Sequence, residues 1–346
     1  MAPIPLSPYG TLQGSLFQYK SSPSMVAFES FPRKQQQQPQ AQESEWMRPN
    51  KCILVGGLGD GLLPTPYTAL LEEALPPSWS LVQPLMSSSG TGFGHGSLSR
   101  DSDELTELLH YLIQHRSAQH FAFVGHSTGC QNAVHLCRQL SLQSSSLSSS
   151  SHEQLKDRIK VIVLQAPVSD REHAMMEPNY EEHLAMARRL VEDAKDAQGA
   201  TNNNDATSPA MMPRSAFWAP ISADRFLALQ EYAGDDDYFS SDLTEQVMLE
   251  RLEHMSHYNH ILVAFSGSDE YVPSHVKKSH LVDRLCHSMT MKQKQTTTTE
   301  TSTNNHVVPL LLEHGNHNLS LGKGDAELFV QEVVSMLNSA IPPLNV

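Results

Sequence analysis

One serine in this sequence has the surroundings of a catalytic nucleophile. Ser127 lies in the segment GHSTG at 125–129, after an apolar run and before a helical pattern. A reactive serine needs a sharp turn at the end of a strand, with glycines beside it because larger side chains would collide with the neighbouring strand or helix. The pattern alone is weak, but its context predicts a nucleophile turn formed by Gly125, His126 and Gly129 around Ser127.

Candidate partners for this serine follow later apolar runs. Asp269 comes shortly after the fifth run, and His317 comes shortly after the last one. A histidine can accept the proton of the serine and return it to the leaving group, while a carboxylate holds the imidazole in the required tautomer. The chain order Ser, Asp, His is that of α/β-hydrolases. Glu270 remains an alternative for the acid, and His314 remains an alternative for the base.

A glycine-rich segment after the first apolar run could bind a developing oxyanion. It reads GGLGDG at 56–61. In α/β-hydrolases this loop supplies one backbone N–H to the oxyanion, and the residue after the nucleophile supplies the second. We predict Leu58 as the first donor, with Gly57 or Gly59 as alternatives, and Thr128 as the second. The segment lacks the third glycine of a dinucleotide-binding loop, so no nucleotide cofactor is predicted.

The cysteines and histidines predict no metal site. The chain has 4 cysteines and 18 histidines, but the cysteines form no CxxC pair and the histidines form no HExxH motif. Buried free thiols are the simpler interpretation of the cysteines, and they favour a reducing compartment. The N-terminal residues do not resemble a signal peptide, and no apolar run reaches about 18 residues. We therefore expect a cytoplasmic protein without a membrane span.

The charge balance limits the class of partner. The chain carries 24 Lys and Arg against 38 Asp and Glu, which gives a net charge of −14. An acidic surface disfavours nucleic acids and anionic membranes as partners. A small-molecule ester is the expected partner, and the sequence leaves the oligomeric state open.

Alternating strand and helix patterns predict the scaffold that positions these residues. Several apolar runs are nearly continuous, which is typical of strands buried on both faces of a parallel sheet. The runs lie at 52–56, 80–85, 121–125, 159–165, 261–266 and 307–312, with helical patterns at 101–115, 130–140 and 325–339 and an edge hairpin at 11–19 and 25–30. This order predicts an α/β-hydrolase fold with a mostly parallel, doubly wound sheet of about eight strands.

One long segment interrupts the alternation. The stretch between the fourth and fifth runs is too long for a crossover helix, and it contains helical patterns at 178–194 and 241–256. We predict a lid inserted at about 170–256 in a single domain that spans 1–346. Low-complexity tracts, expected to be surface loops or disordered, lie at 34–45, 141–151, 196–209 and 292–305.

Two charged groups border the predicted lid. Asp170 and Arg171 lie at its entrance, where we expect an ion pair that anchors the lid. The run Asp235–Asp237 could bind a cation or a cationic group of a substrate. Such runs are more often solvated or cap a helix.

Several longer blocks of sequence carry a family resemblance. They are GGLGDGLLPTPY (56–67), VGHSTGCQNAVHL (124–136), LQAPVSDRE (164–172), GDDDYFSSDL (234–243), SGSDEYVP (266–273) and GNHNL (315–319). With these blocks the sequence resembles the fungal and plant α/β-hydrolases of the DUF1749 (UPF0613) family, which includes siderophore esterases acting on fusarinine-type compounds. The resemblance implies Ser127, Asp269 and His317 as the catalytic triad of an esterase without a cofactor. Asn316 departs from the small residue expected before the histidine.

These observations converge on a serine hydrolase of carboxylic esters that works through an acyl-enzyme. The resemblance adds siderophore-type esters as possible substrates. Two alternatives stay open from the sequence. The first is a non-catalytic binding protein on the same fold, which would not react with a fluorophosphonate probe. The second is a thioesterase, amidase or acyltransferase that uses the same triad, because selectivity depends on the lid and the pocket.

Overall fold

A single eight-stranded sheet forms the centre of the part of the chain that the structure describes. The computed structural model describes residues 9–31, 47–143, 155–201, 209–291 and 306–343. The strands are β1 (Gly14–Lys20), β2 (Met25–Ser30), β3 (Asn50–Val55), β4 (Trp79–Leu85), β5 (His120–His126), β6 (Ile159–Gln165), β7 (His260–Ser266) and β8 (His306–Leu312). Their order across the sheet is β1-β2-β4-β3-β5-β6-β7-β8.

The sheet is parallel from β4 to β8 and antiparallel only at the β1 edge. The β1–β2 and β2–β4 pairs are antiparallel, whereas the neighbouring pairs from β4–β3 to β7–β8 are parallel. Since β3 to β7 are buried along most of their length, their apolar runs are nearly continuous, as expected for strands covered on both faces. The predicted α/β-hydrolase fold with an edge hairpin is confirmed.

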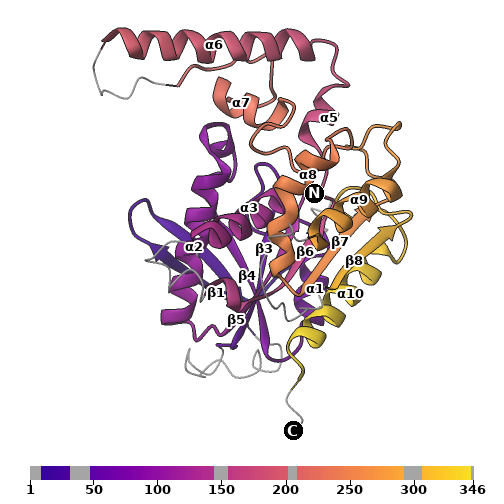
Figure 1. Cartoon of the computed structure of the whole chain (residues 1–346). Coiled ribbons are helices and arrows are strands. Elements are labelled where there is room, and N and C mark those ends of the chain that lie inside the picture. Colours follow the sequence, from indigo (N-terminus) through magenta and orange to yellow (C-terminus); the bar gives the residue numbers. More distant parts are fainter. Residues whose placement is uncertain (1–8, 32–46, 144–154, 202–208, 292–305, 344–346) are drawn as a thin grey trace, which may run out of the picture.

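Helices cover both faces of the sheet (Figure 1). One face packs against α2 (Leu98–His115), α3 (Thr128–Gln143), α8 (Glu245–Leu252) and α9 (Lys278–Thr290) in the larger hydrophobic core. The other face packs against α1 (Thr68–Ala74) and α10 (Asp325–Ala340). The sequence of α2 explains its position, because the Ser97 side chain accepts from the Arg100 N–H at its start and its leucines at helical spacing are buried.

The predicted lid segment divides into two parts. Helices α5 (Asp170–Ala174), α6 (Tyr180–Thr201) and α7 (Ala223–Gln230) form a separate hydrophobic cluster and lie above the sheet (Figure 1). Helix α8 and the following 3-10 turn η4 (Glu253–His257) instead contribute Met248, Leu252 and Met255 to the larger core. We therefore propose that the lid ends near Gly234 and that the rest of the segment 170–256 belongs to the α/β body.

Buried ion pairs join the lid to the body. Arg225 of α7 contacts Asp236 at 2.6 Å, and Arg171 of α5 contacts Asp237 at 3.2 Å and also Asp242. The ion pair expected at the lid entrance is thus formed by Arg171, with Asp237 and Asp242 as its partners, and does not include Asp170. Asp170 instead accepts a hydrogen bond from the Gln131 amide at 3.2 Å. The run 235–237 thus supplies counterions to two buried arginines, which need such partners once they are removed from water.

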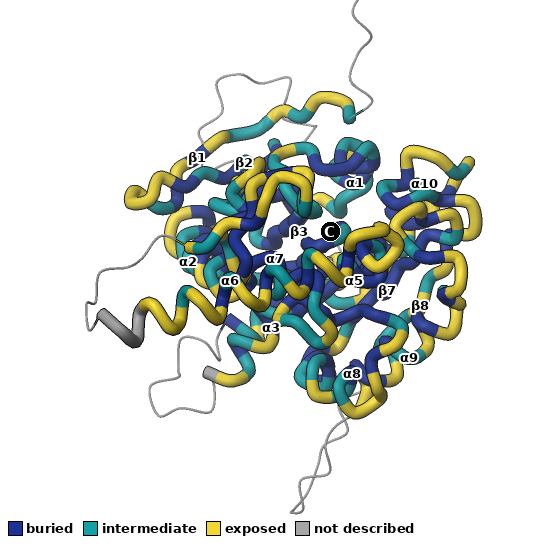
Figure 2. The backbone as a smooth tube through the Cα atoms, turned by 90° about the horizontal axis from the view of Figure 1, so that it is seen from above, coloured by how far each residue is buried: buried dark blue, intermediate teal, exposed yellow. Residues whose placement is uncertain are grey.

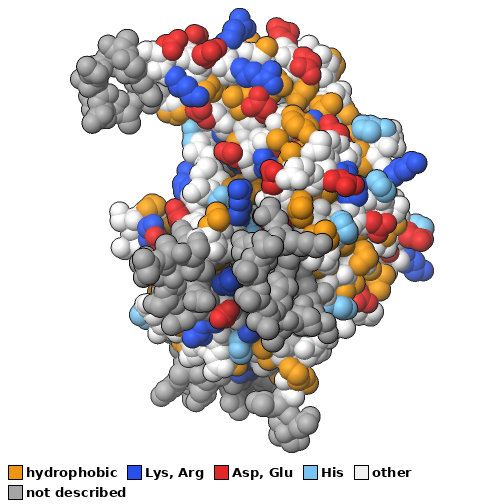
Figure 3. Space-filling model, viewed as in Figure 1, with side chains coloured by type: hydrophobic (Ala, Val, Ile, Leu, Met, Phe, Trp, Pro, Cys, Tyr) orange, Lys and Arg blue, Asp and Glu red, His pale blue; other side chains and the backbone are white. Residues whose placement is uncertain are grey.

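The buried residues of α6 recur every three or four positions, as expected for a helix with one face in the hydrophobic cluster of the lid (Figure 2); they are Tyr180, Leu184, Ala187 and Val191. Lys and Arg lie among Asp and Glu over the outer lid surface (Figure 3). Residues 141–143 continue α3 and residues 196–201 continue α6, so these ends of two low-complexity tracts are helical. The tracts 34–45 and 292–305, with 144–151 and 202–208 of the other two, lie outside the described residues. None of the helices in the described ranges combines the length and the apolar composition that a membrane span requires.

Candidate active site

The residues predicted from the sequence meet at the carboxyl ends of the parallel strands. Ser127 directly follows β5, Asp269 follows β7 and His317 follows β8. Leu58 lies in the loop after β3, which pairs with β5 in the sheet. Because parallel strands bring their carboxyl ends to the same edge, loops that are distant in sequence become neighbours there.

The turn at Ser127 has the strained geometry that its motif predicts. Ser127 has φ +54°, a left-handed conformation that is unusual for serine. A Cβ atom on Gly125 would lie 2.5 Å from the Gly129 carbonyl oxygen, and one on Gly129 would lie 2.2 Å from that of Val55. Both positions therefore require glycine. The strain and the tight packing present the serine above the sheet.

Asp269 is the carboxylate that contacts the imidazole of His317. Nδ1 of His317 lies 2.9 Å from Oδ2 and 3.0 Å from Oδ1 of Asp269, and both side chains are buried. Glu270 has a different contact, because its carboxylate accepts the backbone N–H of His317 at 2.9 Å. His314 is exposed and donates its backbone N–H to Asp325. The geometry thus favours Asp269 over Glu270 and His317 over His314.

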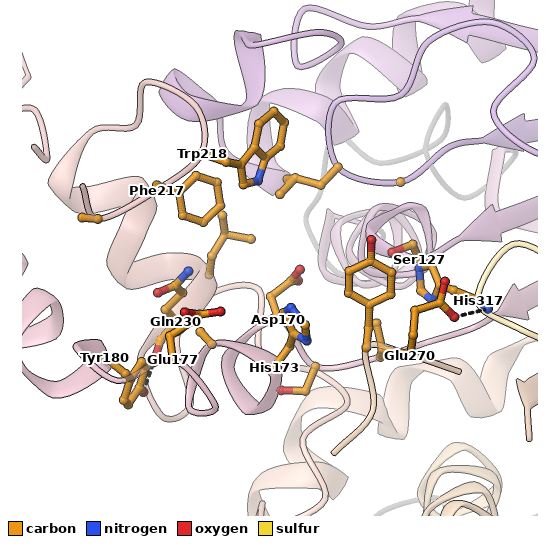
Figure 4. Close-up of a pocket in the computed structure, with 18 of the residues that line it drawn as sticks. Ser127, Asp170, His173, Glu177, Tyr180, Phe217, Trp218, Gln230, Glu270 and His317 are labelled. Carbon is orange, nitrogen blue, oxygen red and sulfur yellow. Dashed lines mark hydrogen bonds between the residues drawn. The ribbon is translucent and has the colours of Figure 1, made fainter. Parts of the chain in front are cut away.

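Ser127 and His317 line the same cavity, and Figure 4 shows their side chains next to each other. The structure forms no hydrogen bond between Ser127 Oγ and His317 within its described ranges. In unliganded enzymes this contact is often long and becomes shorter when substrate binds. The arrangement is therefore compatible with proton transfer from Ser127 to His317.

The loop after β3 approaches Ser127 through Gly57. A Cβ atom at Gly57 would lie 3.3 Å from Ser127 Oγ, so the main chain of the loop is beside the serine. The Gly57 N–H is already donated to the Asp60 carboxylate at 2.8 Å. The Leu58 N–H has no acceptor among the residues that the structure describes, and Thr128 begins α3, where a backbone N–H lacks an intrahelical partner. Leu58 and Thr128 thus remain the predicted donors.

Two aromatic rings lie against His317. Its ring centroid is 4.9 Å from that of His126 and 4.5 Å from that of Tyr271. Burial, with the nearby His317, lowers the pKa of His126 to about 3. His126 is therefore neutral at physiological pH, so it places no positive charge beside an imidazolium that forms on His317.

The cavity extends from Ser127 into the lid and has a volume of about 780 Å³. Its far end is formed by Tyr180, Phe217, Trp218 and Gln230 of the lid (Figure 4). This volume is within the range of ligand pockets that enclose an organic molecule of drug size. One end of the cavity thus belongs to the sheet edge and the other end to the lid.

Asp170 lies between the two ends of the cavity (Figure 4). Burial, with the neighbouring Asp236 carboxylate, raises the pKa of Asp170 to about 7. Its carboxyl group is therefore partly protonated near neutral pH. Within the described ranges no group of three or more His, Cys, Asp or Glu residues is arranged to hold a metal ion.

A comparison with known protein families identifies the family of this chain. The profile of the family described as "Protein of unknown function (DUF1749)" matches residues 11–338. The chain belongs to the DUF1749 family. The family assignment made from the sequence blocks is therefore confirmed.

Named relatives of this DUF1749 protein include an esterase. The Fusarinine C esterase sidJ of Aspergillus fumigatus is 32% identical over 273 residues, covering 68% of this chain and 75% of that protein. The UPF0613 protein PB24D3.06c of Schizosaccharomyces pombe is 30% identical over 249 residues, covering 68% and 73%. The solved structure of siderophore hydrolase EstB from Aspergillus fumigatus is 25% identical, with a TM-score of 0.68 and coverage of 97% and 100%. These similarities confirm that the DUF1749 protein is an α/β-hydrolase of the esterase type.

Sequence reasoning missed three residues around the DUF1749 site. Gln165, Tyr271 and Asp60 contact the predicted residues but belong to no recognised catalytic pattern. The sequence contained a signal for Gln165, since a polar residue ends the otherwise apolar run of β6. It contained none for Tyr271, whose contact depends on how two loops meet.

Proposed function

We propose that this DUF1749 protein hydrolyses carboxylic esters with Ser127, His317 and Asp269 as its catalytic triad. The observation that carries the proposal is the contact between His317 Nδ1 and Asp269, in a cavity that also contains the strained Ser127 turn. A hydrogen bond from Nδ1–H to a carboxylate leaves the other ring nitrogen free to act as a base.

The mechanism follows from these positions. His317 accepts the proton of Ser127 as the serine oxygen attacks the ester carbonyl, and Asp269 stabilises the resulting imidazolium. The Leu58 and Thr128 N–H groups donate to the oxyanion. His317 then protonates the leaving alcohol, and an acyl-enzyme forms on Ser127. Water, deprotonated by His317, releases the acid and restores the serine.

We infer that the substrate is a siderophore-type ester. The support is the likeness to a fusarinine C esterase and to a siderophore hydrolase structure that covers nearly the whole chain. The cavity supports a substrate larger than a simple acyl ester, because it continues past Ser127 to Phe217 and Trp218 of the lid. Trp218 is 63% exposed and so is available to contact the outer part of such a molecule.

The test is a substrate panel measured with purified protein. It compares an ester-linked hydroxamate siderophore, short acyl esters, a thioester and an amide, each with wild type, Ser127→Ala and the exposed control Ser339→Ala. We expect the highest kcat/KM on the siderophore ester, no turnover above background with Ser127→Ala, and wild-type rates with Ser339→Ala. Turnover that survives in Ser127→Ala would reject the triad. A preference for the thioester or amide would reject the substrate class while keeping the triad.

A further inference from the structure

We propose that Gln165 is a positioning residue that fixes His317 relative to Ser127. This rests on the proposed function, because it assigns Gln165 a role in the reaction of that triad. Gln165 is the last residue of β6, between β5, which leads to Ser127, and β7, which leads to Asp269. Its side chain has no exposed surface.

Gln165 contacts the serine and histidine loops through different groups. Its backbone carbonyl accepts the Ser127 N–H at 3.0 Å. Its side-chain Nε2 donates to the backbone carbonyl of His317 at 3.0 Å. One buried residue therefore joins the turn that presents the nucleophile to the loop that presents the base.

The orientation of the Gln165 amide is determined by its partners. The His317 carbonyl can only accept a hydrogen bond, so the Gln165 NH₂ group must face it. The Gln165 oxygen then faces Tyr67 and His126, and it accepts from the Tyr67 hydroxyl at 3.2 Å. Each polar atom of the amide thus has a partner, which a buried polar group requires.

The same orientation determines the tautomer of His126. Nδ1 of His126 lies 2.6 Å from the Gln165 oxygen, which can only accept. His126 must therefore carry its hydrogen on Nδ1, and the low pKa of this buried ring keeps it neutral. Gln165 consequently fixes both the main chain of His317 and the ring that lies against the His317 imidazole.

The consequence for catalysis is geometric. Without the Gln165 amide, the His317 carbonyl loses its donor. Among the described residues, the His317 main chain then keeps only the contact of its N–H with the Glu270 carboxylate, and the loop can move relative to Ser127. The Asp269 carboxylate contacts the imidazole of His317 and not its main chain. A displacement of about 1 Å between reacting groups can reduce a rate by about 100-fold.

The experiment replaces Gln165 with Met, which has similar length but no amide, and with Asn, which is too short to reach both loops. Tyr67→Phe is the matched control, because it removes a buried donor to the same oxygen but keeps the contact with His317. For each variant we would measure the rate constant for fluorophosphonate labelling per reactive site, the final labelled fraction, and kcat and KM. Rates per reactive site do not depend on how much of the variant folds.

We expect both Gln165 variants to label and turn over about 10- to 100-fold more slowly per site, with KM within about two-fold of wild type. Tyr67→Phe should stay within about three-fold of wild type. A wild-type rate per site in both Gln165 variants, even with fewer labelled molecules, would show a purely structural role and overturn the inference while leaving the triad intact. Failure of the wild type to label would overturn the proposed function and the inference together.

Discussion

The α/β body and the lid differ in the interactions that hold each of them in place. In the body, the strands β5 and β7, which lead to Ser127 and Asp269, are buried, and a hydrophobic core lies on each face of the sheet. The lid has a much smaller hydrophobic cluster of its own, and two buried arginine–aspartate pairs connect it to the body.

This difference between body and lid predicts different effects of mutations on the chemical step and on substrate binding. Apolar burial is non-directional and spread over many residues, so the sheet of the body depends on no single contact. A buried ion pair depends on both partners, because removal of one leaves an uncompensated charge. We therefore expect variants in the body site to change the rate of the chemical step, and variants at the lid contacts to change substrate binding.

The largest effect should come from Asp269. Asp269→Asn removes the carboxylate that orients the His317 ring, and we expect kcat to fall by about 10⁴-fold. The melting temperature should change little, since the amide has nearly the same shape. Steady-state kinetics and a thermal melt measure the two quantities. Glu270→Gln is the matched comparison, because it keeps an oxygen that can accept the His317 N–H, and an equal loss in both variants would contradict the assignment of the acid.

A smaller effect is expected at the contact between lid and body. Arg225→Met leaves the Asp236 carboxylate buried without its cation, and breaking such a pair costs about 3–5 kcal/mol. Hydrogen exchange should accelerate in α6 and α7 but not in β5. KM for a large ester should rise, while the labelling rate of Ser127 by a small phosphonate changes little.

The control for this variant lies within the lid itself. Arg188→Met breaks the pair between Arg188 and Glu231, in which the arginine side chain is 54% exposed. Exposed pairs contribute at most about 1 kcal/mol, so exchange and KM should stay near wild type. Equal effects of Arg188→Met and Arg225→Met would contradict the idea that buried pairs hold the lid.

The smallest effect concerns pH. The pKa of Asp170 is raised from its ordinary value of 3.8 to about 7, so the folded protein holds this proton more tightly than the unfolded chain does. The contribution of Asp170 to stability is therefore fully present below pH 4 and is lost as the pH rises through about 7. Asp170→Asn should flatten the decline of the melting temperature between about pH 4 and pH 7. A slope that matches wild type would show that Asp170 does not titrate in this range.

The sequence predicted the body better than the lid, for a physical reason. Strands such as 261–266 are recognisable because burial on both faces demands continuous apolar residues, and Ser127 is recognisable because its turn demands glycines. The partners of Arg171 and the proposed end of the lid near Gly234 depend on contacts between segments distant in sequence. No local pattern encodes such contacts.

In the candidate active site, too, local patterns predicted some residues, whereas others depend on contacts between distant segments. Asp269 and His317 lie a few residues after the ends of their strands, so chain order and strand ends made them candidates. Gln165 is the last residue of a strand whose apolar run predicted only a part of the sheet. Its proposed role depends on contacts with Tyr67, His126 and His317, which are distant from it in the sequence. The choice between Asp269 and Glu270 also needed side-chain geometry, because adjacent residues have the same relation to the preceding strand.

Peptide mapping after fluorophosphonate labelling tests the central assignment most directly. The purified protein would be labelled, digested and analysed by tandem mass spectrometry, with Ser127→Ala treated in parallel. We predict one modified residue, Ser127, in the peptide that contains GHSTG, and no modification in the variant. A label on a different residue, or an unlabelled wild type, would contradict the account.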